Sequence, residues 1–177
     1  FNKDNVQFNG NGQYMKSSNK LSIGNDGDFS VEFYVNYTPS GSNNTRKIFE
    51  LISEKNSENL INMSNINQTY SEIRLSNGSV WKGNLPETTL TYSTNGSQPD
   101  ASNFSPGAPL STGILPNTLV HYVLTVSESK VTLYRNGSSY FEKSGSNLSV
   151  KKLDRNIYIA RGLNDSDLSS NMKMYYF

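Results

Sequence analysis

The sequence predicts an all-β fold, an antiparallel two-sheet jelly-roll sandwich, from three observations. Short segments in which apolar and polar residues alternate recur along the chain, as strands with one buried face require. The 177 residues include 24 asparagines and 27 serines, which are unfavourable inside helices and common in turns. Asn-Gly dipeptides suit tight hairpin turns. They occur at Asn9-Gly10, Asn11-Gly12, Asn77-Gly78, Asn95-Gly96 and Asn136-Gly137.

The clearest strand covers residues 30–37, where every second side chain from Val31 to Tyr37 is apolar or aromatic. Residues 119–126, LVHYVLTV, are apolar or aromatic on both faces, so we expect a central strand that is covered on most of both sides. His121 lies inside this segment. A histidine in the middle of an apolar strand is ordinarily a packed core or sheet-face residue.

A hairpin is expected where residues 131–134 and 138–141 flank the turn Arg135-Asn136-Gly137. The remaining segments show weaker alternation, bounded by turn residues. We expect further strands at 6–8, 13–16, 47–53, 59–63, 72–76, 80–82, 89–93, 156–160 and 172–177.

The length predicts a single domain over residues 1–177. Because the chain begins with Phe1 rather than Met, and its last strand pattern stops without a turn, we expect a fragment of a longer surface protein. Residues 95–117 are rich in Ser, Gly and Pro and are expected to form a long loop, which is either a mobile connection or functional.

Composition excludes several classes of function. Sixteen Lys and Arg residues against 15 Asp and Glu residues give a net charge of +1, so no strong field attracts nucleic acid. Cysteine is absent and His121 is the one histidine, which excludes disulfide frameworks, thiolate metal sites and histidine clusters. No apolar run is long enough for a membrane span or a signal peptide.

Several segments together carry a resemblance to a known family. They are VQFNGNGQYMKSS, LSIGNDGDFSVEFYVNY and LVHYVLTVSESKVTLYRNGSSYFE, with NIYIARG and MKMYYF behind them. This order resembles a laminin G-like domain of the concanavalin A-like lectin/glucanase superfamily. Residues 55–117 show no such likeness. The positions that fit are scaffold positions: Gly10, Phe29, Phe33, His121, Leu133, Tyr134, Asn136 and Gly137.

The resemblance implies a two-sheet jelly roll of about a dozen antiparallel strands, with the closing strand beside the first. It also implies a module that binds carbohydrate or protein ligands, in some members with calcium. The enzymatic branch of this superfamily carries a Glu-x-Asp-x-x-Glu strand, because a nucleophile and an acid must flank the scissile bond. That pattern is missing here. We therefore expect a protein that is not an enzyme.

The nearest carboxylate clusters are Glu50 with Glu54, and Asp26 with Asp28. Glu50 and Glu54 are four residues apart, so on a strand both side chains would point the same way. Lys47 and Lys55 close by favour a solvated charged face over a catalytic pair. A Ser-His-Asp triad is also not expected, because no Ser lies in a G-x-S-x-G elbow.

Two loops offer oxygen ligands for calcium. Asp26-Gly27-Asp28 and the segment Asn164, Asp165, Ser166 and Asp167 both place oxygen side chains close together, as a calcium ion with six to eight oxygen ligands requires. Such residues more often close turns through their own backbone. We prefer Asn164, Asp165 and Asp167, since that loop joins two expected strands at the edge of the sandwich.

Carbohydrate recognition needs an aromatic platform together with amide and carboxylate partners for hydroxyl groups. The middle of the chain supplies these types in Trp81, Tyr92, Asp100, Asn103 and Phe104. The alternative is that Trp81 and Tyr92 are core or strand-surface aromatics.

N-glycosylation is possible if the chain passes through a eukaryotic secretory route, although a low-complexity sequence makes such motifs by composition alone. The Asn-x-Ser/Thr motifs begin at Asn36, Asn43, Asn62, Asn67, Asn77, Asn95, Asn103, Asn136, Asn147 and Asn164.

The sequence thus favours a non-enzymatic glycan-binding or adhesion module of an extracellular, cell-surface, toxin or virion protein. Its partner would be a glycan or a surface protein, within an assembly that can be oligomeric. The alternative is a structural subunit or spacer of a surface fibre or capsid, with protein contacts and no sugar binding. A glycoside hydrolase is the remote alternative.

Overall fold

The computed structural model describes the chain in thirteen stretches. These are residues 5–24, 28–38, 45–54, 56–66, 70–75, 80–84, 91–93, 115, 117–145, 148, 150, 152–163 and 168–177. At residues 45, 56–60, 65–66, 70–72, 80–84, 91–93 and 168 the structure describes the backbone alone. Within these stretches the chain is all β, and no helix is present that could cross a membrane.

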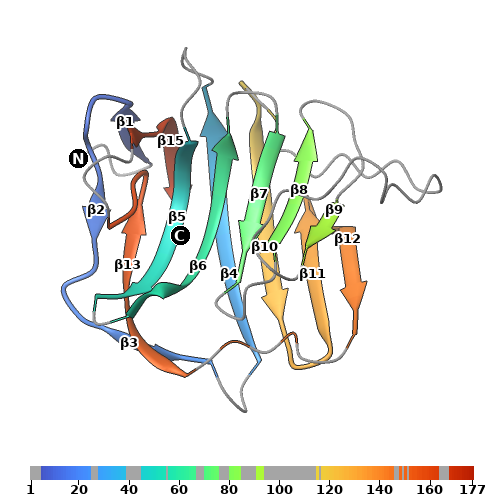
Figure 1. Ribbon diagram of the computed structural model, residues 1–177. Helices are drawn as coiled ribbons and strands as arrows, with labels where there is room; N and C mark the ends of the chain where they lie inside the picture. Colours follow the sequence, from blue (N-terminus) through green and yellow to red (C-terminus); the bar gives the residue numbers. More distant parts are fainter. Residues whose placement is uncertain are drawn as a thin grey trace.

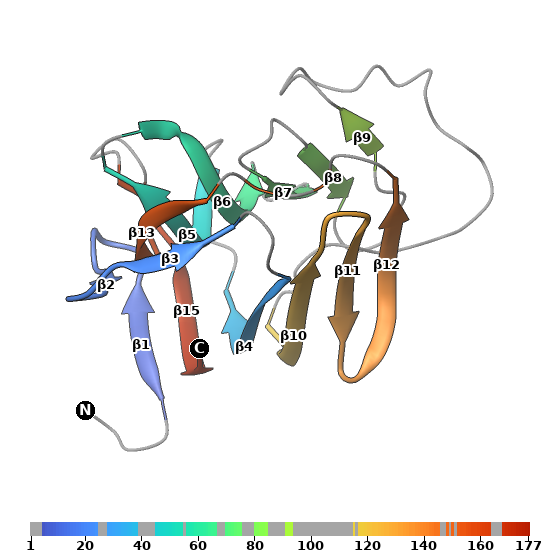
Figure 2. The same ribbon diagram turned by 90° about the horizontal axis from the view of Figure 1, so that it is seen from below.

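Two sheets form two layers, as Figure 2 shows. The smaller sheet has six antiparallel strands in the order β1 (Val6–Asn9), β15 (Asn171–Tyr176), β4 (Phe29–Tyr37), β10 (Leu119–Val126), β11 (Lys130–Arg135) and β12 (Ser138–Ser144). The last strand lies beside the first, which the family resemblance implied. The fold is therefore the expected two-sheet sandwich.

The larger sheet has nine strands (Figure 1). Its main path is β2 (Met15–Lys16), β13 (Leu153–Ile159), β5 (Thr45–Ser53), β6 (Asn56–Ile66), β7 (Tyr70–Arg74), β8 (Val80–Asn84) and β9 (Thr91–Ser93). Two short strands complete it. β3 (Leu21–Ile23) pairs with β13, and β14 (Leu168–Ser169) pairs in parallel with β5.

The core lies between the two sheets, and Phe33 of β4 joins both layers. Its ring centroid lies 5.3 Å from that of Tyr122 on β10 and 5.6 Å from that of Phe49 on β5, and all three side chains are buried. The alternation predicted for residues 30–37 is confirmed, because Val31, Phe33, Val35 and Tyr37 are all buried.

β10 is central in its sheet, as predicted, but the expectation that both of its faces are mostly covered is wrong. Alternate residues from Val120 to Val126 are buried, while the outer face, which includes His121, is only partly covered. Among the strands that the structure describes, none of the larger sheet lies over this face (Figure 2). His121 is thus a sheet-face residue.

The predicted hairpin is confirmed between β11 and β12. Asn136 and Gly137 have φ angles of 49° and 80°, the left-handed conformations that a two-residue turn of this kind needs. The Asn136 side chain ties this turn to β10, because its Oδ1 accepts a hydrogen bond from the His121 backbone N–H over 3.0 Å. In return the Asn136 N–H donates to the His121 carbonyl over 2.9 Å.

Candidate functional site

A row of polar residues crosses the outer face of the larger sheet at one register. Lys16 pairs with Tyr158, Tyr158 with Glu50, and Glu50 with Asn62. Arg74 is the next partner of Asn62. Because directly opposed residues on neighbouring strands share a face of the sheet, these five side chains form a continuous strip across β2, β13, β5, β6 and β7.

Glu50 is the buried centre of this polar row, with 1% of its surface exposed. Its carboxylate lies 2.5 Å from Lys47 Nζ, accepts the Leu163 backbone N–H over 2.9 Å, and accepts Asn62 Nδ2 over 3.4 Å. The expectation of a solvated face around Glu50 is therefore wrong. Burial is possible because an ammonium and two hydrogen-bond donors replace the water that the carboxylate loses.

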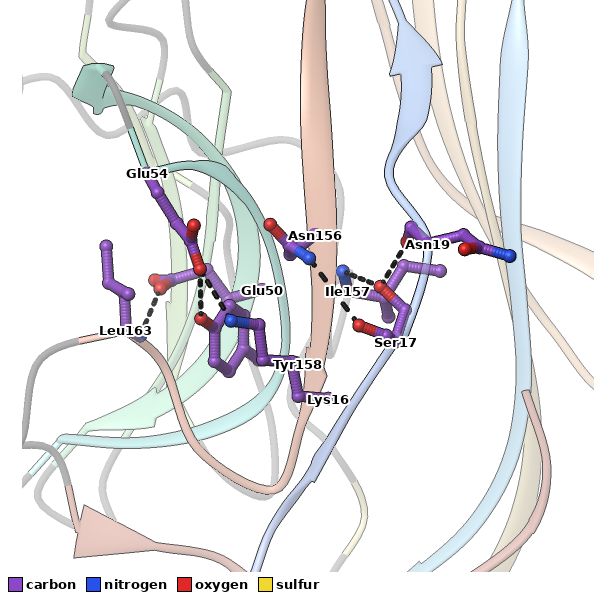
Figure 3. A network of polar contacts seen from close by, with 9 residues as sticks. All are labelled: Lys16, Ser17, Asn19, Glu50, Glu54, Asn156, Ile157, Tyr158 and Leu163. Atoms are coloured by element: carbon purple, nitrogen blue, oxygen red, sulfur yellow. Dashed lines mark hydrogen bonds and ion pairs between the residues drawn. The ribbon is translucent and has the colours of Figure 1, made fainter.

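Glu54 lies near Glu50 in a different setting (Figure 3). Its Oε1 is 2.6 Å from Lys16 Nζ and accepts the Tyr158 hydroxyl over 3.3 Å, and both Lys16 and Glu54 are partly exposed. The hydrogen bond from Lys16 is the main cause that lowers the pKa of Glu54, and the same bond raises the pKa of Lys16. Glu54 therefore presents an ionised carboxylate at neutral pH.

Tyr14 provides an exposed aromatic ring next to this pair. It has 46% of its surface exposed and stacks on Tyr158, with ring centroids 6.3 Å apart and an angle of 23° between the planes. Arg161 Cζ lies 5.0 Å from the centre of the Tyr14 ring. We call Tyr14, Lys16, Glu54, Tyr158 and Arg161 the Tyr14 platform.

Ser17, the residue that follows β2, joins this part of the platform to β13. The Ser17 N–H donates to the Ile157 carbonyl over 2.9 Å, and Ser17 Oγ accepts the Ile157 N–H over 3.0 Å. The hydroxyl also donates to the Asn19 carbonyl, and Asn156 Nδ2 donates to the Ser17 carbonyl (Figure 3). These bonds hold Lys16 and Tyr14 in place although β2 is an edge strand.

The platform can bind a ligand that has both an apolar face and hydroxyl groups. An exposed ring stacks on the C–H face of a sugar, and a carboxylate beside an ammonium offers an acceptor and a donor to sugar hydroxyls. The sequence analysis did not single out Tyr14. Residues 13–16 predicted a strand, but the sequence of that strand does not show that the Tyr14 ring stacks on Tyr158 of another strand.

The residues predicted to bind carbohydrate lie elsewhere. Trp81 and Tyr92 are direct cross-strand partners on β8 and β9, at the opposite end of the larger sheet from β2, so the structure brings their backbones together. Asp100, Asn103 and Phe104 lie outside the described residues, as does most of the long loop expected at 95–117.

The predicted calcium ligands Asn164, Asp165 and Asp167, and Asp26 of the other loop, also lie outside the described residues. Asp28 is described and exposed. Among the side chains that the structure describes, no three His, Cys, Asp or Glu residues are grouped in a way that could hold a metal ion.

Three of the predicted glycosylation sites fall in the described part of the chain. Asn136 is exposed in the hairpin turn, Asn36 is partly buried on β4, and Asn62 is buried with its amide on Glu50. The others lie outside the described residues: Asn43, Asn67, Asn77, Asn95, Asn103, Asn147 and Asn164.

Comparisons with known proteins agree with this architecture. A family model described as the concanavalin A-like lectin/glucanases superfamily matches residues 9–173. A native heptameric SAP-like pentraxin from Limulus polyphemus is similar in structure, with a TM-score of 0.55 and 13% identity over 99% of this chain and 75% of that chain. Among curated proteins, none gives a significant sequence match.

Two carbohydrate-related structures are also similar. The CBM40 of the Ruminococcus gnavus IT-sialidase, solved with alpha2,3 sialyllactose, has a TM-score of 0.51 and 8% identity over 97% of this chain and 89% of that chain. The kappa-carrageenase of Pseudoalteromonas carrageenovora, solved with an oligotetrasaccharide of kappa-carrageenan, has a TM-score of 0.47 and 12% identity over 92% and 65% of the two chains. At these identities, the pentraxin and CBM40 likenesses show a shared fold.

Proposed function

Because the chain belongs to the concanavalin A-like lectin/glucanase superfamily, we propose that it is a non-enzymatic carbohydrate-binding module that holds a glycan on the Tyr14 platform. The observation that carries this proposal is an exposed ring, supported by a second ring, beside an ionised carboxylate and an ammonium. We place the module outside the cell, as is typical of such domains.

The two carboxylates of this face support binding rather than hydrolysis. A glycosidase needs one carboxylic acid whose pKa is raised so that it can protonate the leaving group. Lys16 lowers the pKa of Glu54, which is the opposite direction. Glu50 is enclosed by Lys47, Asn62 and the Leu163 N–H, so its oxygens are already occupied.

The Lys16–Glu54 pair of the platform favours a sugar with little net charge. Lys16 and Glu54 neutralise each other at 2.6 Å, so neither a strongly anionic nor a strongly cationic ligand gains much from them. A sugar hydroxyl, which donates and accepts at once, can use both groups. Trp81 and Tyr92 remain a separate proposed contact at the other end of the sheet.

The test is a glycan array in calcium-containing buffer with the wild type and three variants. Tyr14→Ala should weaken binding about tenfold, the effect of losing roughly 1.4 kcal/mol of ring contact. Tyr14→Phe keeps the ring and should bind like the wild type, and Trp81→Ala reports on the other end of the sheet. Unchanged binding by Tyr14→Ala would show that the platform is not the site. Glycan cleavage by the wild type would exclude the non-enzymatic role.

A further inference from the structure

A second surface of aromatic and polar residues lies on the outer face of the smaller sheet. This is the opposite side of the sandwich from the Tyr14 platform, as the two layers of Figure 2 make clear. The surface is a shallow hollow of about 660 Å³. We call it the His121 hollow, and it is lined by Glu32, Tyr34, Leu119, His121, Asn136, Tyr175 and Tyr176.

Tyr34 organises the rings of the hollow. It pairs across the sheet with His121 on one side and Tyr176 on the other. Its ring meets His121 at 5.7 Å and 61°, and meets Tyr175 at 6.3 Å and 78°, which are edge-to-face contacts. Tyr175 and Tyr176 keep 38% and 57% of their surfaces exposed. The hollow therefore combines a supported ring with open ring surface.

Polar groups of the hollow are also held in place. His121 Nε2 lies 2.7 Å from Glu32 Oε1, and the two side chains remain 31% and 46% exposed. Asn136 is fixed by its two hydrogen bonds with the His121 backbone. A site whose groups are ordered before the ligand arrives loses less entropy on binding.

The chemistry of these groups fits a neutral sugar better than an ion. Glu32 already has His121 beside it, which reduces its attraction for a cation, and the carboxylate opposes an anion. Imidazole, carboxylate, amide and phenol groups together offer both donors and acceptors, as sugar hydroxyls need. Tyr176 offers a ring face to the C–H groups of the sugar.

We propose that the His121 hollow is a second binding site for neutral oligosaccharide, so that one molecule holds two glycan chains on opposite faces. The inference takes its ligand class from the proposed function but uses none of the residues of the Tyr14 platform. Two sites on opposite faces let one molecule bridge two chains of a polysaccharide, which raises its avidity for a glycan surface.

The test compares wild type, Tyr14→Ala, Tyr176→Ala and the double variant. The probes are laminarihexaose, xylohexaose, mannohexaose and chitohexaose at about 10 mM, enough to reveal millimolar affinity. Calorimetry measures the stoichiometry. Because His121 is the only histidine, its ring C–H resonances report occupation of the hollow without ambiguity. Circular dichroism checks that each variant is folded, which we expect because Tyr14 and Tyr176 are exposed.

We expect Tyr14→Ala to keep one site and a shift of the His121 resonances on addition of sugar. Tyr176→Ala should lose that shift, with at least tenfold weaker binding at the hollow. If His121 does not respond to any probe in Tyr14→Ala, the second site is overturned while the platform can still bind. If Tyr176→Ala removes all binding and Tyr14→Ala none, the platform fails and the hollow stands. A dimer by light scattering that Tyr176→Ala dissociates would instead make this face a self-association surface and overturn the proposal.

Discussion

The outer faces of the two sheets differ in how deeply their carboxylates are buried. On the larger sheet Glu50 is buried among Lys47, Asn62 and the Leu163 N–H. On the smaller sheet the carboxylate of Glu32 has a similar close partner, His121, but nearly half of the Glu32 side chain is in contact with solvent. Both carboxylates therefore have a partner at hydrogen-bond distance and differ mainly in burial.

This difference separates a buried carboxylate with a structural role from the carboxylates on the two proposed binding surfaces. A buried ion pair has lost its water, so each member depends on the other. An exposed pair can exchange its partner for water or for a ligand at little cost. We therefore assign Glu50 to holding the larger sheet together, and Glu32 and Glu54 to surfaces that a ligand can reach.

The largest predicted effect comes from breaking the buried pair. Glu50→Ala takes the carboxylate from beside the buried ammonium of Lys47 and removes the acceptor of the Leu163 N–H. We expect the free energy of unfolding to fall by about 3–5 kcal/mol. Urea denaturation measures this value. The matched variant Glu32→Ala on the open face should lose less than about 1 kcal/mol.

The double variant Lys47→Met with Glu50→Leu is the control for this comparison. It replaces both charges with apolar side chains of similar size, so no buried charge is left behind. We expect it to be more stable than Glu50→Ala. Equal losses for Glu50→Ala and Glu32→Ala would mean that burial does not distinguish the two faces.

The next largest effect concerns the hairpin turn beside the open face. Gly137 has a φ of 80°, and an added Cβ would meet nothing within 4 Å, so Gly137→Ala introduces backbone strain without a clash. We expect the free energy of unfolding, measured by thermal denaturation, to fall by about 1–2 kcal/mol. Gly145→Ala is the matched control, because its site is equally open and its backbone is not left-handed. Similar losses at both positions would show that the cost is not φ strain.

The sequence predicted the strands well because alternation is a local property. All thirteen expected strand segments correspond to observed strands, with residues 119–126 matched at both ends. β3 and β14, strands of three and two residues, were missed. The burial of Glu50 was also missed. It depends on a hydrogen bond from Leu163, which is more than a hundred positions away in the sequence. It also depends on an irregularity in the register of β5 between Lys47 and Phe49, which interrupts the simple alternation of faces along the strand.

The candidate sites were harder to predict than the fold. Trp81 and Tyr92 were chosen by residue type, and they prove to be cross-strand partners. The Tyr14 platform and the His121 hollow both depend on rings from distant strands, such as Tyr14 on Tyr158 and Tyr34 beside Tyr175. The sequence of one strand does not show which residues of other strands will contact it. Only the register of the sheet brings them together.

The smallest predicted effect tests whether exposure, rather than the choice of sheet, separates the two kinds of carboxylate. Glu54 lies on the same face as Glu50 but is partly exposed, and Lys16 lowers its pKa below the ordinary value of 4.5. Because its pKa is lowered, the ionised Glu54 contributes stability to the fold above pH 4.5. This contribution is lost as the pH falls through the lowered pKa. The raised pKa of Lys16 sets the alkaline limit of this stabilisation. The contribution of Lys16 to stability is fully present below pH 10.5 and is lost as the pH rises through the raised pKa.

Glu54→Gln should therefore be slightly less stable than the wild type between these limits, and the two should converge in acid. Urea denaturation at a series of pH values, repeated in about 1 M salt, measures the difference. Salt should reduce it, since exposed charges are screened within about 3 Å at that concentration. A large difference that salt does not change would place Glu54 with Glu50 among the buried groups. A small, salt-sensitive difference would confirm that solvent access sets the role of each carboxylate, on either sheet.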